Sequence, residues 1–353
     1  MKNIISILTF VFLTVSCIKV TDAPDIPEAD FTIGGGILLV NEGNFRSGNG
    51  SLSFYSYDSL KIFNDLFANV NNRPLGDVPN SVLVKEDKIF IIVNNSARIE
   101  IVNHSSCESI GTINGLISPR NMAVINDNKA YVTSLYSDSV AIINLPDNSV
   151  SGYINLRRTS EALTVAGNEA FIANWAGGKD VMVVNTISDK VVDSIEVGME
   201  PESMAIDNKR RLWVLCNGGW ARQNAAELVV INISTHKIEK KFTFSSKLSS
   251  PTCLQVDGVG QTLYFIDKGI KVMDINSVNL PVAPLIPEEA DLSFYKIAIN
   301  PVNSDIFISD VADYIQPGNL LLYKNDGNFV SRNKAGIIPG AMCFKLRINT
   351  QAK

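Results

Sequence analysis

Residues 160–198 read SEALTVAGNEAFIANWAGGKDVMVVNTISDKVVDSIEVG. This stretch contains four short runs of apolar or alternating residues, with turn-forming Gly, Asn, Ser and Asp between them. Such runs, bounded by turn residues, are typical of β-strands joined by hairpins. The stretch therefore predicts a unit of four short antiparallel strands.

The same unit recurs along the chain. Residues 119–156 and 201–244 repeat the four runs in the same order. An asparagine that ends the third run falls at Asn103, Asn144, Asn185 and Asn232, with spacings of 41, 41 and 47 residues. Further copies occupy residues 80–114, 250–287 and 294–335. A fixed period of this length indicates a repeat architecture, and four strands per repeat are typical of a propeller blade.

The two ends of the chain complete one unit between them. Residues 37–67 supply only three runs, ILLV, SLSFYSY and KIFNDLF, and the missing first run is GAMCFKL at residues 340–346. A C-terminal strand that completes an N-terminal blade closes a ring and removes exposed sheet edges. We therefore predict an all-β fold, a seven-bladed β-propeller over residues 34–346 with a C-terminal tail at 347–353. An open β-solenoid or two β-sandwiches are the alternatives, but a solenoid needs no circular completion.

Composition agrees with a β fold and argues against nucleic-acid binding. The 353 residues are 46% hydrophobic and only 19% charged, with a formal net charge of −5. Helix surfaces are usually rich in Glu, Lys and Arg, so a low charged fraction favours strands. Nucleic-acid proteins need a basic surface that displaces counterions from phosphates. We expect no nucleic-acid partner.

The N-terminus has the pattern of an export signal. Lys2 precedes a short apolar run from Ile4 to Val15, which is too short to span a bilayer as a helix. Residues TVSC end this run, and the small Ser16 before Cys17 resembles a bacterial lipobox, although Thr14 replaces the usual aliphatic residue. We expect residues 1–16 to be a signal peptide, Cys17 to be lipidated, and residues 17–33 to form a flexible tether. An ordinary secretory signal with an incidental cysteine is the alternative.

Catalytic and metal-binding patterns are absent from the sequence. The four remaining cysteines, Cys107, Cys216, Cys253 and Cys343, have irregular spacing and form no CxxC pair, and their pairing stays open. The chain has only two histidines, His104 and His236. Metal sites need clustered His, Cys or carboxylate ligands, and most acid–base sites use histidine. We expect no catalytic residue, no metal and no cofactor.

One face of the predicted ring differs from the other. With the strands of a blade labelled a to d from the centre outward, the a–b and c–d turns are short and ordinary. The b–c loops carry aromatic and amide side chains, and the d–a connections on the same face add arginines. Aromatic rings with oriented amides are typical of small-ligand surfaces. The candidate ligand-binding residues are Asn41, Phe45, Arg46, Arg73, Asn94, Arg120, Tyr136, Arg158, Asn174, Trp175, Asn217, Trp220 and Tyr314. Strand-end amides that bond to their own turns, and loop aromatics that cap the core, are the alternative explanation.

The first b–c loop, NEGNFRSGNG at residues 41–50, has the glycine spacing of a phosphate-binding loop. Asn49 and Gly50 stand where that motif needs Lys and a hydroxyl residue, and the following SLSFYSY alternates like a strand. We interpret it as a wide loop that carries Phe45 and Arg46 towards the ligand.

The segments NEGNFRSGNGSLSFY, NDLF and NNRPLGDVPNSV (71–82) resemble the exported surface-layer-like, YncE-like propeller lipoproteins of Bacteroidetes. Within that group the chain looks most like the BtuG-type vitamin B12-binding surface lipoproteins. The resemblance implies a lipid-anchored protein on the outer face of the outer membrane. It implies that the protein captures a corrinoid and passes it to a TonB-dependent transporter. Two other functions stay open, a surface module that binds a protein or glycan, and a propeller enzyme such as a lactonase or quinone-dependent dehydrogenase.

Overall fold

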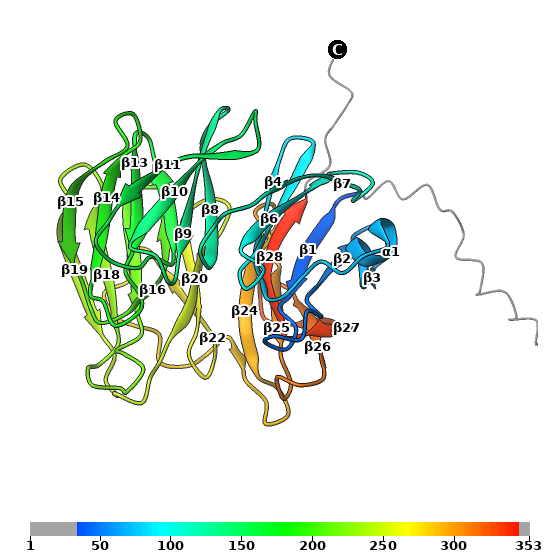
Figure 1. Ribbon diagram of the computed structural model, residues 1–353. Coiled ribbons are helices and arrows are strands. Elements are labelled where there is room, and N and C mark those ends of the chain that lie inside the picture. Colours follow the sequence, from blue (N-terminus) through cyan, green and yellow to red (C-terminus); the bar gives the residue numbers. More distant parts are fainter. Residues whose placement is uncertain (1–33, 346–353) are drawn as a thin grey trace, which may run out of the picture. The chain divides into compact units, whose positions relative to one another are not determined.

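The computed structural model describes residues 34–345. The predicted signal peptide, Cys17, the tether and the C-terminal tail lie outside these residues. Within them, seven antiparallel four-stranded sheets confirm the predicted seven-bladed β-propeller (Figure 1). None of the helices in the described residues is long and apolar enough to cross a membrane.

The four strands of each blade follow one another from the innermost to the outermost. In that order, blades 1 to 4 are β28 (Pro339–Lys345), β1 (Gly36–Asn41), β2 (Ser51–Ser56), β3 (Lys61–Phe63); β4 (Pro79–Lys85), β5 (Lys88–Val93), β6 (Arg98–Asn103), β7 (Ser109–Ile113); β8 (Pro119–Asn126), β9 (Lys129–Ser134), β10 (Ser139–Asn144), β11 (Ser149–Asn155); and β12 (Leu163–Ala166), β13 (Glu169–Ala173), β14 (Asp180–Asn185), β15 (Lys190–Glu196). Blades 5 to 7 are β16 (Pro201–Ile206), β17 (Arg211–Cys216), β18 (Glu227–Asn232), β19 (Lys237–Thr243); β20 (Thr252–Val256), β21 (Thr262–Ile266), β22 (Gly269–Asp274), β23 (Ile286–Pro287); and β24 (Phe294–Ile299), β25 (Ile306–Asp310), β26 (Pro317–Tyr323), β27 (Phe329–Ile337).

The position of a strand within its blade explains its sequence. The second strand of a blade, such as β5 with KIFIIV, is buried on both faces because neighbouring blades pack against it. The outermost strand β15, with KVVDSIE, is mostly exposed. The core consists of apolar clusters between adjacent blades, for example one that joins residues of blades 1 and 2.

The ring closes as the sequence predicts. The innermost strands contact one another in the order β28, β4, β8, β12, β16, β20, β24 and back to β28, so they surround a central axis. Strand β28 pairs antiparallel with β1, with Leu38 opposite Cys343 and Gly36 opposite Lys345. The last strand of the chain therefore supplies the innermost strand of the first blade.

One predicted strand is partly wrong. The run KIFNDLF was expected to form a strand throughout, but β3 ends at Phe63 and helix α1 spans Leu66–Asn71. Asp65 has a φ of 55°, which breaks the strand, and Leu66 and Phe67 are then buried against blades 1 and 2. A short apolar run does not distinguish a strand from a buried helical turn, because both bury the same residues.

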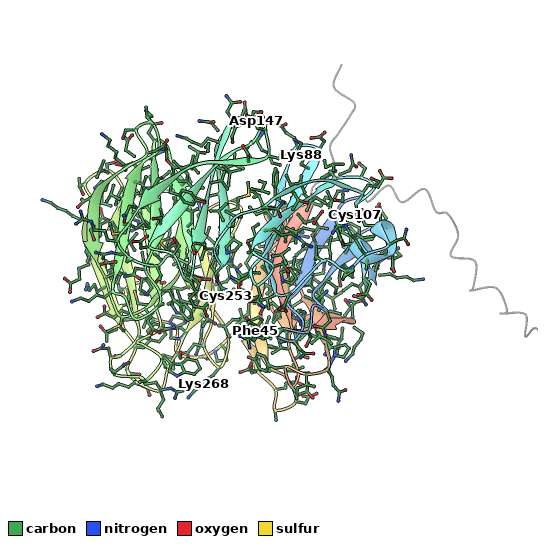
Figure 2. All side chains as sticks on the ribbon, in the orientation of Figure 1. Phe45, Lys88, Cys107, Asp147, Cys253 and Lys268 are labelled. Atoms are coloured by element: carbon green, nitrogen blue, oxygen red, sulfur yellow. The ribbon has the colours of Figure 1, made fainter. Side chains whose placement is uncertain are left out.

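The propeller has two distinct faces. We call the face with the b–c loops and d–a connections the loop face, and the face with the a–b and c–d hairpins the hairpin face. Phe45 and Lys268, in b–c loops, lie at the bottom of the view in Figure 2, and Lys88 and Asp147, at hairpins, lie at the top. His104 and His236 follow third strands and belong to the hairpin face.

The four cysteines of the described residues are free thiols. Cys107, Cys216 and Cys253 are buried, and Cys343 is partly buried. Burial raises the pKa of the Cys107 and Cys216 thiols to about 12. These side chains behave as small apolar residues.

Candidate functional site

The predicted aromatic residues lie in the b–c loops of five blades. Trp220, Tyr136 and Phe45 are 91%, 78% and 65% exposed, and Tyr314 is about half exposed. Trp175 is partly buried, and its Nε1 has no hydrogen-bond partner among the described residues. Large exposed rings on one face supply apolar contact area for a ligand.

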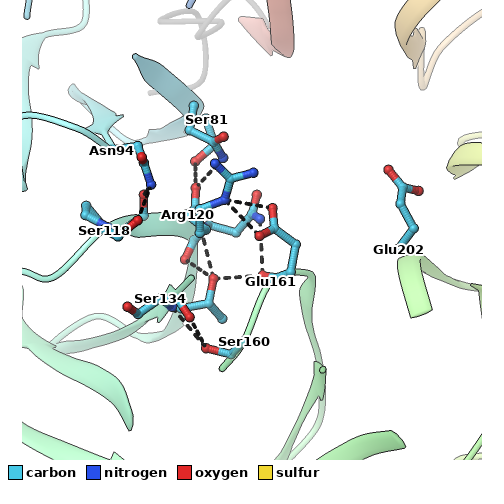
Figure 3. A network of polar contacts seen from close by, with 12 residues as sticks. Ser81, Asn94, Ser118, Arg120, Ser134, Ser160, Glu161 and Glu202 are labelled. Atoms are coloured by element: carbon cyan, nitrogen blue, oxygen red, sulfur yellow. Dashed lines mark hydrogen bonds and ion pairs between the residues drawn. The ribbon is translucent and has the colours of Figure 1, made fainter. Parts of the chain in front are cut away.

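The predicted amides have structural partners instead. Asn41 is fully buried and donates to the hydroxyls of Ser51 and Ser53, while its Oδ1 accepts from the backbone N–H of Gly336. Asn94 donates to Ser118 and to the carbonyl of Pro119 in the next blade, as Figure 3 shows for Ser118.

The two other predicted asparagines contact their own loops, Asn217 through its side chain and Asn174 through its backbone. Oδ1 of Asn217 accepts from the N–H of Gly219. Asn174 is partly buried, and its backbone N–H donates to the carbonyl of Asp180 at the end of the same loop. Buried amides need partners, and the strand ends provide them.

Three of the four predicted arginines contact a carboxylate or an aromatic ring and are separate from the arrangement around Arg120. Arg73 forms an ion pair with the buried Glu100 at 2.6 Å and covers the ring of Phe67, so it belongs to the outer strands of blade 2. Arg158 pairs with Asp180 at the base of the Trp175 loop. Arg46 lies over the exposed ring of Phe45.

Arg120 takes part in a separate arrangement around the central axis. A β-bulge near the start of six of the seven innermost strands, all except β12, adds one residue to the inner strand. Asn80, Arg120, Glu202 and Tyr295 lie in four of these bulges. Bulges re-aim a side chain at the rim of a closed sheet. We infer that they direct these side chains towards the axis on the loop face.

A signal for these bulges exists in the sequence. A proline opens the innermost strand in PNS, PRN, PES and PGA, at Pro79, Pro119, Pro201 and Pro339, and Pro251 directly precedes the innermost strand in PTC. The loop aromatics and amides do not indicate where these bulges lie. The sequence places Arg120, Glu161 and Glu202 on the loop face, but only Arg120 was predicted to bind a ligand. Glu42, Tyr295 and Lys296 were not predicted as site residues.

These six residues form the channel-mouth cluster: Glu42, Arg120, Glu161, Glu202, Tyr295 and Lys296. Nε of Arg120 donates to both carboxylate oxygens of Glu161, at 3.0 and 2.8 Å (Figure 3). Nζ of Lys296 lies 3.6 Å from Oε1 of Glu202. The hydroxyl of Tyr295 donates to Oε1 of Glu42 at 2.9 Å. These contacts join blades 3 and 4, 5 and 7, and 7 and 1, all at the loop-face ends of their strands.

Electrostatics couple the members of this cluster. Burial raises the pKa of Glu42, while the hydrogen bond from Tyr295 and the charges of Lys296 and Arg120 oppose that rise. Burial alone would lower the pKa of Lys296, but the carboxylate of Glu202 and nearby groups hold it above its usual value. Both cations therefore stay charged, and both act on Glu42.

Tyr314, one of the exposed aromatic residues of the b–c loops, contacts the channel-mouth cluster. Its ring packs edge-on against Tyr295 with centroids 6.0 Å apart, and its carbonyl accepts a hydrogen bond from the side chain of Asn44. An exposed loop aromatic therefore lies directly beside the charged opening. Within residues 34–345 we find no group of three or more His, Cys, Asp or Glu side chains that could hold a metal ion.

Solved structures with the same fold have varied roles. A quinonprotein alcohol dehydrogenase-like protein from Bacteroides thetaiotaomicron matches with a TM-score of 0.69 at 14% identity, over 90% of this chain and 79% of that one. A candidate 6-phosphogluconolactonase from Bacteroides uniformis matches with a TM-score of 0.67 at 10% identity, over 88% and 99%. Virginiamycin B lyase from Staphylococcus aureus matches with a TM-score of 0.60 at 13% identity, over 76% and 89%. At these identities the likeness shows the fold alone.

Sequence comparison identifies the family. No curated protein matches the chain. A family model described as a domain of unknown function, DUF5074, matches residues 35–330, which is most of the propeller. The chain therefore belongs to the DUF5074 family of β-propeller proteins.

Proposed function

We propose that this propeller is a non-catalytic binding protein that captures a small ligand on its loop face. A corrinoid is the first ligand to test, with a TonB-dependent outer-membrane transporter as the recipient. We also propose that lipidated Cys17 anchors the protein at the outer membrane, facing the cell exterior.

One observation carries the proposal of a binding face. The channel-mouth cluster is partly exposed at the centre of the same face on which Phe45, Tyr136, Trp220 and Tyr314 are exposed. Concave sites with apolar walls and a few convergent polar groups are typical of ligand binding. Tyr314 joins the two parts, because it is exposed and also packs on Tyr295 of the cluster.

Pairing within the cluster favours binding over catalysis. The carboxylate of Glu161 accepts from Arg120, Glu202 accepts from the N–H of Cys253 at 2.7 Å, and Glu42 accepts from Tyr295. A catalytic nucleophile or base needs a partner that activates it for a reacting atom. These contacts instead hold side chains in place, which reduces the entropy lost when a ligand binds.

The corrinoid assignment rests on the family resemblance and on chemical fit. A corrin is a broad, flat macrocycle with amide groups at its edge. Exposed aromatic rings can pack on its faces, and the amide carbonyls can accept from Arg and Lys. A wide face with several exposed aromatic residues suits such a ligand better than a narrow pocket would.

The chain leaves the propeller on the side away from the proposed site. Gly34 precedes β1 on the hairpin face, and its carbonyl lies 3.5 Å from Nζ of Lys345 at the end of β28. The first described residue of the propeller therefore lies on the face opposite the proposed site.

Calorimetry with cyanocobalamin tests the corrinoid proposal. The chain without residues 1–17 is expected to bind cyanocobalamin and to carry its red colour through gel filtration. Neither heat nor co-migrating absorbance at micromolar protein would contradict the corrinoid assignment.

Trp220 favours a second candidate, a surface module that binds a protein or glycan. It lies 91% exposed in the longest b–c loop, between β17 and β18, where a large partner can reach it. Aromatic anchors of this kind are frequent at binding hot spots. Retrieval of a surface polysaccharide or a non-transporter protein by the wild type, and not by Trp220→Ala, would favour this candidate.

A further inference from the structure

The channel-mouth cluster contains hydrogen-bond donors that the protein does not use. This inference rests on the proposed ligand-binding face and concerns the chemistry of the ligand. Nε of Arg120 makes both contacts with Glu161. Within residues 34–345, neither terminal nitrogen of Arg120 hydrogen-bonds to another residue, and neither is among the buried atoms that lack a partner. The outer edge of the guanidinium is therefore accessible.

Lys296 is in a similar position. Its ammonium lies 3.6 Å from Glu202, beyond hydrogen-bond distance, and 5.3 Å from the ring centre of Tyr295. The side chain is 32% exposed. An ammonium has three N–H donors, so it retains capacity for a further acceptor.

Four of the six carboxylate oxygens of the cluster accept hydrogen bonds. Both oxygens of Glu161 accept from Arg120. Glu202 accepts from Cys253, and Glu42 accepts from Tyr295. The unused donors at the opening lie on Arg120 and Lys296, and a ligand that pairs with these two cations must supply acceptors.

The geometry of the opening adds an apolar wall. Tyr295 and Tyr314 pack edge-on, the ammonium of Lys296 lies over the ring of Tyr295, and Tyr314 is about half exposed. A guanidinium edge matches two oxygens of one anionic group better than it matches a single carbonyl. We propose that the channel mouth binds an anionic head group, a carboxylate or phosphate attached to an apolar ring, through Arg120 and Lys296.

A purely structural role for the cluster is the competing explanation. Arg120 and Lys296 would then only join neighbouring blades, and their replacement would lower stability without changing ligand preference. Binding preference, measured separately from stability, distinguishes the two explanations.

Four small aromatic probes of matched shape test the proposal. Benzoate and phenyl phosphate carry the anionic group, benzamide is its neutral counterpart, and benzylammonium is the cation. Affinities are measured by ligand-observed NMR titration at constant ionic strength with the chain lacking residues 1–17. At least one anionic probe is expected to bind about tenfold or more tightly than benzamide, because hydrogen bonds to charged groups are the strong ones. The ratio between benzoate and phenyl phosphate then identifies which anion the site prefers.

Variants connect the preference to the two cations. Arg120→Gln and Lys296→Gln are each expected to reduce affinity for the preferred anion about tenfold and to leave benzamide affinity unchanged. Arg120→Lys keeps the charge but removes the two-nitrogen edge, so an intermediate loss is expected. Arg210→Gln and Lys190→Gln, at exposed hairpin-face positions, are matched controls and should have no effect.

Three results would overturn the inference: no binding of either anionic probe, equal affinity for benzamide, or unchanged anion affinity in both Gln variants. Melting curves identify a variant that fails to fold, and Lys296→Gln and Arg120→Lys then still decide the question. Cyanocobalamin is titrated in parallel. Anion preference without cyanocobalamin binding would overturn only the corrinoid assignment, and the reverse result would overturn only this inference.

Discussion

The hydroxyl of Tyr295 donates a hydrogen bond of 2.9 Å to Oε1 of Glu42. This contact joins β24, the innermost strand of blade 7, to the residue that follows β1 in blade 1. Burial raises the pKa of Glu42, and the same contact opposes that rise. The bond therefore helps to hold blades 7 and 1 together, and it also favours the charged form of Glu42 at the channel mouth.

Tyr295→Phe removes this donor and leaves the partly buried carboxyl of Glu42 without it. We expect a loss of about 1–3 kcal/mol in the free energy of unfolding, which is typical for an unsatisfied buried polar group. Urea unfolding measures the change. Tyr136→Phe, at a 78% exposed position, is the control and should be neutral. An equal effect of the two substitutions would contradict the structural role of the bond.

Arg73→Gln separates a structural arginine from the proposed ligand-binding one. Glu100 is buried, and its other contacts are Arg98 at 3.5 Å and the hydroxyl of Ser109. Loss of the Arg73 ion pair should cost about 1–3 kcal/mol of stability, because Glu100 stays buried. Ligand affinity should not change, in contrast to Arg120→Gln. Thermal melts and probe titrations measure the two effects, and reduced affinity at unchanged stability would place Arg73 in the site.

His236 predicts a pH-dependent contact on the hairpin face. Its Nδ1 lies 2.8 Å from Asp193 and its Nε2 lies 3.1 Å from Glu169 in the neighbouring blade. Burial would lower the pKa of His236, but the two carboxylates raise it above its usual value of 6.5. Because the folded pKa is the higher one, the stabilising contribution is complete below pH 6.5 and is lost as pH rises through the folded pKa.

His236→Gln should therefore lower the melting temperature more at pH 6 than at pH 9. Scanning fluorimetry across this range measures the difference between wild type and variant. His104→Gln is the control, because burial lowers the pKa of His104 instead. A difference that is independent of pH would contradict this assignment of the contact.

Removal of β28 tests the closure of the ring. A chain that ends at residue 338 loses the strand that pairs with β1, and it exposes the edge of β1 and the apolar residues between blades 1 and 7. Unpaired edges promote aggregation, so we expect little soluble monomer. A chain that ends at residue 346 retains β28 and should behave as wild type. Gel filtration and circular dichroism compare the two, and a folded monomer ending at 338 would contradict the role of β28.

Trp220→Ala tests whether the exposed aromatic residues of the loop face bind the ligand. If the loop face binds a corrinoid, loss of this ring should reduce cyanocobalamin affinity about tenfold, a usual cost for an aromatic anchor. Stability should not change, because the side chain is almost fully exposed. Tyr153→Ala, an exposed aromatic on the outermost strand β11, is the control. Equal affinities of the two variants, measured by calorimetry, would remove Trp220 from the site.

Sequence pattern predicted the parts of the site that depend on position within a repeat. The b–c loops, their exposed aromatics and the place of Arg120 on the loop face follow from counting strands. The partners of Asn41, Asn94 and Arg73 do not, because they come from Ser53, Pro119 and Glu100 on other strands or blades. The sequence contains both members of each pair but not their proximity.

The sequence by itself determined the fold, because a period near 41 residues, four alternating runs per unit and one run displaced to the C-terminus are compatible with a closed ring and with few other arrangements. Only the tertiary structure decided which polar side chains meet at the channel mouth. Bulges at the starts of the innermost strands shift the register by one residue, and a shift of one residue reverses the direction of a side chain. Alternation in the sequence does not record that shift, so the grouping of Glu42, Arg120, Glu202 and Lys296 follows only from the closed ring.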